Sequence, residues 1–138
     1  MVKQYVIDAC ALVALFENEN GADFVEAMLA EANLGNIKLR MSKLNLLEVY
    51  YGDYRAHGKK SADAMLKLVK NLPITIIPEM TDGVFLEAGR LKATYKMSLA
   101  DAVVLAEASV GGGAVLTADH HEFDVVEQNE KIEFAWIR

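Results

Sequence analysis

The sequence predicts an α/β fold: a three-layer α/β/α sandwich with a central parallel sheet. Short apolar segments alternate along the chain with longer stretches of helical composition. This order is typical of a parallel sheet whose two faces are both covered by helices. The chain has 138 residues, of which 53% are hydrophobic and 25% charged, so it can form a substantial core. We expect residues 1–138 to form a single domain.

The first half of the chain begins with a short apolar strand, followed by two helices. The turn signal Asn-Glu-Asn-Gly at 18–21 separates these helices. Ser42 is a plausible N-cap for the next helix, which ends before the break at His57-Gly58, and Ser61 is expected to cap the one after it. The expected segments are strand 3–8, helices 9–17 and 22–33, strand 37–42, and helices 43–55 and 62–71.

The second half repeats this alternation of strands and helices. Pro73 and Pro78 bound a third strand, and the glycines at 111–113 end a helix and lead into another strand. His120 and His121, which lie between the last two strands, are expected to be loop residues. The expected segments are strand 74–77, helices 81–95 and 98–109, and strands 114–118 and 132–137.

Acidic residues stand at the carboxyl ends of two expected strands. Asp8 interrupts the apolar run YVIDACALVALF, and a carboxylate is costly to bury without compensation. Asp119 follows the strand AVLTA, in which Thr117 offers a hydroxyl close to it. Ligands of open parallel sheets bind beyond the carboxyl ends of the strands. We therefore expect Asp8 and Asp119 to face one crevice.

Two further acids lie in helices that begin near the same edge. Glu48 is surrounded by apolar residues in SKLNLLEVYYG, and Asp101 lies about one turn into the helix of SLADAVVLAEA. Several carboxylates cannot share a small volume unless cations neutralise them or some become protonated. A set of oxygen ligands without a His or Cys cluster suits Mg²⁺ or Mn²⁺. Two such ions can bind the two sides of a phosphodiester. A bound metal ion would also compensate for the buried negative charge of Asp8.

Each acid also has a purely structural interpretation. Asp8 could cap the helix that follows it, and Asp101 stands at the capping-box distance from a serine. Glu48 could simply face water, and Asp119 could belong to a turn. The hypothesis of a metal site therefore depends on three or four of these acids converging at one edge of the sheet.

Taken in order, these segments resemble the PIN-domain ribonucleases, most closely the VapC-type toxins of prokaryotic toxin–antitoxin pairs. The resemblance rests on YVIDACALVALF, SKLNLLEVYYG, SLADAVVLAEA and GGAVLTADHHEF, and it covers essentially the whole chain. It implies metal-dependent RNA cleavage, a homodimer, and an antitoxin whose amphipathic segment occupies an apolar groove formed by the first helices. It places the family's catalytic acids on Asp8, Glu48, Asp101 and Asp119.

In this scheme Asp8, Asp101 and Asp119 hold Mg²⁺ or Mn²⁺, and Glu48 ligates or orients the attacking water. Thr117 is expected to support Asp119. One position departs from the family, because Cys10 stands where many relatives carry Ser or Thr. A thiol is a weaker hydrogen-bonding group than a hydroxyl, and we expect Cys10 to be packed and inert rather than nucleophilic.

The charge distribution leaves room for an RNA partner. The net charge is −6, which at first argues against nucleic acid, but residues 55–70 contain five basic residues against one acidic residue. A solvated, lysine-rich helix face explains that segment equally well. The candidates for contacts with the RNA backbone are Arg40, Arg55, Lys59, Lys60 and Arg90.

Other classes of protein remain open. The alternative to a ribonuclease is a catalytically weak or inactive PIN-like module that binds RNA or a protein partner without turnover. An aspartyl phosphotransferase fits less well, because Cys10 stands where a second acid is usual and no lysine stands near Asp119. A receiver domain fits less well because ITIIPE lacks a well-placed acid to accept phosphate. One cysteine cannot form an intrachain disulfide, and no apolar run approaches the length of a membrane span. We expect a cytoplasmic protein without a membrane partner.

Overall fold

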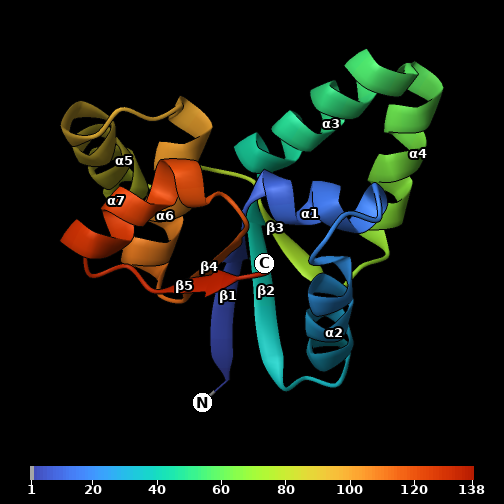
Figure 1. Ribbon diagram of the computed structural model, residues 1–138, viewed down its shortest axis with the longest axis horizontal. Helices are drawn as coiled ribbons and strands as arrows, with labels where there is room; N and C mark the ends of the chain where they lie inside the picture. Colours follow the sequence, from blue (N-terminus) through green and yellow to red (C-terminus); the bar gives the residue numbers. More distant parts are fainter. Residues whose placement is uncertain (1) are drawn as a thin grey trace.

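The computed structural model describes residues 2–138, and it confirms the expected sandwich around a parallel sheet. Within these residues, five parallel strands form one sheet in the order β3-β2-β1-β4-β5 (Figure 1). Because β2 lies on one side of β1 and β4 on the other, the strand order reverses beside β1. The strands are β1 Lys3–Ile7, β2 Ile37–Ser42, β3 Ile74–Ile77, β4 Ala114–Thr117 and β5 Phe134–Trp136.

Helices cover both faces of the sheet. Helices α1 to α4 pack on one face and α5 to α7 on the other, as Figure 1 shows on the two sides of the strands. Neighbouring strand residues divide between the two cores, with Val6 on the α5–α7 side and Ile7 on the α1–α4 side. The helices are α1 Ala9–Phe16, α2 Ala22–Asn33, α3 Lys43–His57, α4 Lys59–Lys70, α5 Asp82–Thr94, α6 Leu99–Gly111 and α7 His120–Asn129.

Helix α4 begins earlier than the sequence suggests. It starts at Lys59, directly after Gly58, whose φ of 92° allows a sharp reversal of the chain after α3. The prediction that Ser61 caps this helix is therefore wrong. The Ser61 hydroxyl instead donates to Oδ1 of Asp53 at 2.8 Å and joins α4 to α3.

Helix α7 was not expected, and the prediction that His120 and His121 are loop residues is wrong. Asp119 is the N-cap of α7, and its side chain accepts a hydrogen bond from the backbone N–H of Glu122. The helix is short and mostly polar, and Phe123 is one of only two residues that it buries. So few apolar positions gave too weak a periodic signal to predict a helix.

Close packing of β1 against β4 depends on one glycine. Gly113 has a φ of 112°, and a Cβ atom at this position would lie 2.6 Å from the carbonyl oxygen of Gln4. This close approach lets β4 begin beside β1. Among the helices within residues 2–138, none has the length and apolar character needed to cross a membrane.

Candidate metal centre

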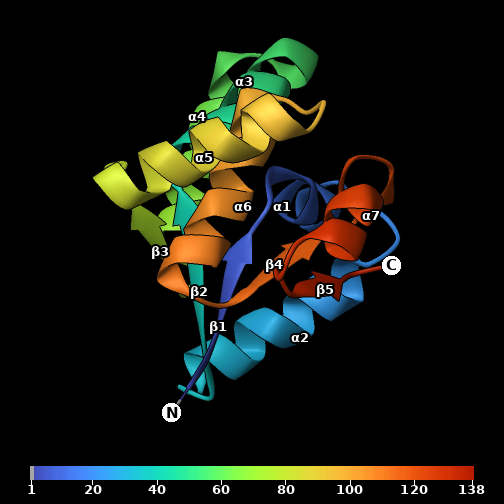
Figure 2. The ribbon, with the colours of Figure 1, turned by 90° about the vertical axis from the view of Figure 1, so that its left-hand side faces the viewer.

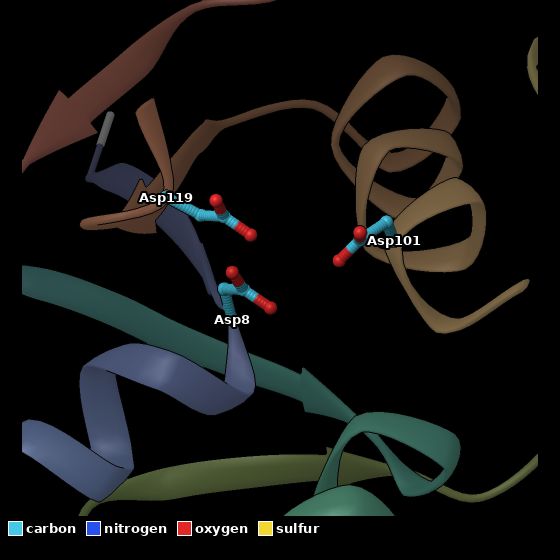
Figure 3. A group of neighbouring side chains, drawn as sticks. All are labelled: Asp8, Asp101 and Asp119. Carbon is cyan, nitrogen blue, oxygen red and sulfur yellow. The ribbon is translucent and has the colours of Figure 1, made fainter. Parts of the chain in front are cut away.

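Three aspartates converge where the strand order reverses. Asp8 follows β1, Asp119 follows β4, and Asp101 lies in the first turn of α6. Each offers a carboxylate oxygen, and these three atoms all lie within 4.8 Å of one another. Figure 3 shows the side chains pointing into a common space. The convergence expected from the sequence is therefore present for these three residues.

Asp8 is almost completely buried, at 3% exposure, and its carboxylate is held by several donors. Its Oδ1 accepts from the backbone N–H of Ala9 at 2.8 Å, so it caps α1 while it faces the cluster. Its Oδ2 accepts from the Thr117 hydroxyl at 2.9 Å and from the Cys10 thiol at 3.2 Å. Burial raises the pKa of Asp8, and these hydrogen bonds partly offset the rise.

Thr117 connects two of the aspartates. Its Oγ1 donates to Asp8 and accepts from the backbone N–H of Asp119 at 3.0 Å. It is fully buried, so a lost partner could not be replaced by bulk water. The structure thus places Thr117 between Asp8 and Asp119, in contact with both.

Cys10 also contacts this group of residues. Its Sγ lies 3.2 Å from Thr117 Oγ1 and accepts from the backbone N–H of Ala118 at 3.3 Å. Burial and the charge of Asp8 raise the pKa of the thiol to about 12, so it stays protonated at neutral pH. A protonated thiol is a poor nucleophile but can donate to Asp8, so Cys10 takes the place of a hydroxyl as a weak donor.

Asp101 and Asp119 are positioned by helix starts. Ser98 caps α6 by accepting from the backbone N–H of Asp101 at 3.1 Å, and Asp119 itself caps α7. Burial, followed by the negative charge of Asp8, raises the pKa of Asp101 to about 7. Repulsion within the cluster therefore opposes the simultaneous ionisation of its members.

Glu48 stands at the margin of the cluster. It is not one of the three residues whose oxygens lie within 4.8 Å, but burial and the charge of Asp8 raise its pKa. A hydrogen bond from Asn45 acts in the opposite direction. The structure thus brings Glu48 within electrostatic reach of the three aspartates without adding it to their immediate group.

Asn45 is a further residue of the site, for which the sequence pattern predicted no role. It is fully buried, and its Nδ2 donates to the carbonyl oxygen of Ala100 at 3.2 Å. Ala100 precedes Asp101, so this bond joins the start of α3 to the start of α6. An asparagine within the apolar stretch SKLNLLE was the available signal.

The residues present fit a divalent cation. Among residues 2–138, no lysine, arginine or histidine forms an ion pair with Asp8, Glu48, Asp101 or Asp119. Burial, together with the charges of neighbouring acids, raises the pKa values of Asp8, Glu48 and Asp101, so a cation there would favour their ionised forms. Carboxylate oxygens are the ligands preferred by hard cations, so the cluster could hold such an ion.

The five basic residues considered for RNA binding are not gathered at this cluster. Arg40 donates to a backbone carbonyl just after α6, and Arg90 forms ion pairs with two glutamates. Lys59 pairs with an aspartate one turn later, and Arg55 lies over a tyrosine ring. Lys60 is exposed on α4. The structure assigns local contacts to four of these residues, and their proposed contacts with RNA remain predictions.

The fold and the cluster together define an α/β protein with a candidate divalent-metal centre at the edge where its parallel strands end. The sequence matches the PIN domain family over residues 5–129, so the chain belongs to this family. The resemblance expected from the sequence is confirmed. Among proteins with curated descriptions, no sequence match was found.

Solved structures share this fold at low sequence identity. The DNA-bound VapBC complex from Salmonella typhimurium gives a TM-score of 0.74 at 15% identity and covers 100% of both chains. VapBC2 from Rickettsia felis, bound to a promoter DNA fragment, gives a TM-score of 0.74 at 14% identity, and the match covers 96% of this chain and 97% of that chain. VapC20 from Mycobacterium tuberculosis, described as a sarcin–ricin loop cleaving toxin, gives a TM-score of 0.56 at 16% identity. The match covers 80% of this chain and 86% of that chain.

Proposed function

We propose that this protein is a metal-dependent endoribonuclease and the toxin of a VapBC-type toxin–antitoxin pair. The observation that carries the proposal is the convergence of Asp8, Asp101 and Asp119 within 4.8 Å, in a cluster without a basic partner. Membership of the PIN-domain family and the toxin–antitoxin complexes among the similar structures support it. The proposed substrate is RNA, and the proposed cofactor is Mg²⁺ or Mn²⁺.

The proposed mechanism assigns a role to each acid. A bound Mg²⁺ or Mn²⁺ would supply a hydroxide-like nucleophile and stabilise charge on the phosphodiester. Asp8, Asp101 and Asp119 would hold the ion, and Thr117 fixes the orientation of Asp8 through its hydroxyl. Glu48, at the margin of the cluster, orients the attacking water through a carboxylate oxygen.

An antitoxin is the proposed protein partner. A groove of about 660 Å³ lies between α1, α3 and α4, and its lining includes the apolar side chains of Val13, Phe16 and Leu68. An amphipathic segment can bury an apolar face in such a groove. We assign this groove to the antitoxin, consistent with the antitoxin segment expected from the sequence.

A homodimer is the proposed assembly. Leu44 packs against the core, but Leu47 on the same helix is 51% exposed. On α5, Phe85 and Leu86 are 65% and 69% exposed. Exposed apolar surface of this kind favours association with a second copy. The proposed location is the cytoplasm.

The test of the ribonuclease proposal is cleavage of a mixed RNA pool by wild type and Asp8→Asn, with Mn²⁺ and with a chelator. We expect metal-dependent cleavage by wild type and a loss of at least about 100-fold in Asp8→Asn, because the substitution removes a charged ligand. Asp23→Asn, an exposed position on α2, is the matched control and should cleave normally. Undiminished cleavage by a folded Asp8→Asn would refute the assignment.

A second candidate function is a PIN-like module that binds RNA or a protein without turnover. Cys10 favours it, because a thiol donates more weakly to Asp8 than a hydroxyl would. Absence of cleavage in every reaction, with a folded wild type that binds Mn²⁺, would support this candidate over the nuclease.

A further inference from the structure

Three aromatic rings form a column between β5 and α7. The rings of Phe134 and Trp136 are inclined by 11° with centroids 5.3 Å apart. The ring of His120 stacks on Trp136 with a centroid distance of 3.8 Å and an angle of 15°. Figure 2 shows α7 lying next to β5, the arrangement that brings these rings together. The column therefore ends on the imidazole of His120.

The His120 ring is held in a fixed orientation. Its Nδ1 lies 2.9 Å from Oδ1 of Asp124, and its Nε2 lies 2.9 Å from the backbone carbonyl oxygen of Arg138. The neighbouring Trp136 is also fixed, because its Nε1 donates to Glu127 at 3.2 Å. Rings held in this way lose little conformational entropy when a ligand stacks on them.

One face of the His120 ring remains open. Trp136 covers the opposite face, and both ring nitrogens have partners, yet the side chain is 48% exposed. With one ring face against Trp136 and both nitrogens in contact, the ring surface left for solvent is its other face and its carbon edges. The structure thus presents a flat, preorganised aromatic surface to solvent.

This surface lies beside the candidate metal centre. His120 follows Asp119 directly in the chain, so their Cα atoms are about 3.8 Å apart. Since both residues stand at the start of α7, the base assigned to the imidazole is that of the nucleotide adjacent to a phosphodiester held at the aspartates. The side chains of Asp124 and Glu127 also surround the column, so a phosphate is disfavoured there and an uncharged ring is favoured.

We propose that the open face of His120 is a stacking subsite for one base of a single-stranded RNA, next to the bond that is cut. The choice of RNA as ligand rests on the function proposed above. Aromatic side chains stack on bases of every kind because each base has a π-face. Such a base must be unpaired and unstacked, which selects loops and single strands over duplexes.

The fluorescence of Trp136 provides a direct assay. It is the only tryptophan in the chain, and it stacks on His120. The probe is a short oligoadenylate, titrated in a chelator so that no cleavage interferes. We expect saturable quenching by this probe and none by an abasic ribose-phosphate chain of equal length. Equal responses to the two chains, or no response to either, would overturn the subsite.

Three variants separate stacking from a structural role. His120→Ala should weaken oligoadenylate binding about tenfold, because it removes the stacking ring. His120→Phe keeps a stacking ring but loses both nitrogen contacts, so it should retain most of the binding that His120→Ala loses. His121→Ala is the matched control, since this neighbouring side chain is 94% exposed, and it should leave binding unchanged. If His120→Phe binds as weakly as His120→Ala, the imidazole only holds the backbone at Arg138, and the proposal fails.

The failure of this subsite can be distinguished from the failure of the proposed nuclease. Metal-dependent cleavage by wild type, together with equal oligoadenylate binding by wild type and His120→Ala, would overturn only the subsite. Absence of cleavage, together with quenching that depends on the ring at His120, would leave the subsite intact and refute turnover. Asp8→Asn should lose cleavage and retain the quenching.

Discussion

Replacing Asp101 with asparagine should change how the stability of the metal-free protein depends on pH. Burial and the charge of Asp8 raise the pKa of Asp101 from its ordinary value of 3.8 to about 7. Between these two values, the folded chain keeps a proton that the unfolded chain has released. The free energy of unfolding therefore falls as the pH rises through this window, and it is lowest above pH 7.

The expected magnitude follows from the part of the window that lies above pH 5. Titration between pH 5 and about pH 7 spans about two pH units, or about 2.7 kcal/mol at about 1.36 kcal/mol per unit. Because the side chain is partly exposed, screening by water reduces the expected loss to about 1.4 kcal/mol. Asp101→Asn removes the titrating group and should abolish most of this loss.

The assay is urea unfolding at pH 5 and pH 8 in the presence of a chelator. The loss between the two conditions should be about 1.4 kcal/mol larger in wild type than in Asp101→Asn, and Asp101→Asn should be the more stable protein at pH 8. Asp23→Asn, on the exposed surface of α2, should behave as wild type does. An Asp101→Asn variant with the pH dependence of wild type would show that burial and the charge of Asp8 do not raise the pKa of Asp101.

Two further substitutions test how the site and the sheet are held. Thr117→Val removes a donor to Asp8 and the acceptor of a backbone N–H, so urea unfolding should show a loss of about 2 kcal/mol. Thr117→Ser keeps the hydroxyl and should lose clearly less; equal losses would contradict a role for that group. Gly113→Ala should cost about 3 kcal/mol in the same assay, because its Cβ would lie 2.6 Å from Gln4 and φ is 112°. Gly112→Ala has open space at a φ of 83° and should cost only about 1 kcal/mol, so equal costs would show that contact with Gln4 is unimportant.

The strands and most of the helices were predictable because their signals are local. Ser42 and Ser98 cap α3 and α6 as expected, since a capping side chain binds a backbone N–H within its own turn. Gly58 illustrates the limit of such reasoning. A glycine with positive φ started α4 without a side-chain cap, and the hydroxyl of Ser61 was free to bind Asp53 instead.

The candidate site was predictable to the extent that chain topology dictates it. Asp8 and Asp119 follow strands that are both parallel and adjacent, so the fold class alone places them at one edge. The position of Asp101 was predictable because it lies in the first turn of α6, a helix that starts beside that edge. Asn45 was not found, because its role depends on a hydrogen bond to Ala100, 55 positions away in the chain.

The sequence by itself determined the α/β class, the order along the chain of the strands and of every helix except α7, and the acids that stand at strand and helix ends. These follow from hydrophobic patterning and capping, which act within a few residues. Only the tertiary structure decided that three of those acids lie within 4.8 Å, that Thr117 contacts Asp8 across 109 positions, and that His120 stacks on Trp136. Such contacts depend on strand register and on side-chain packing between distant segments, and a linear sequence pattern specifies neither.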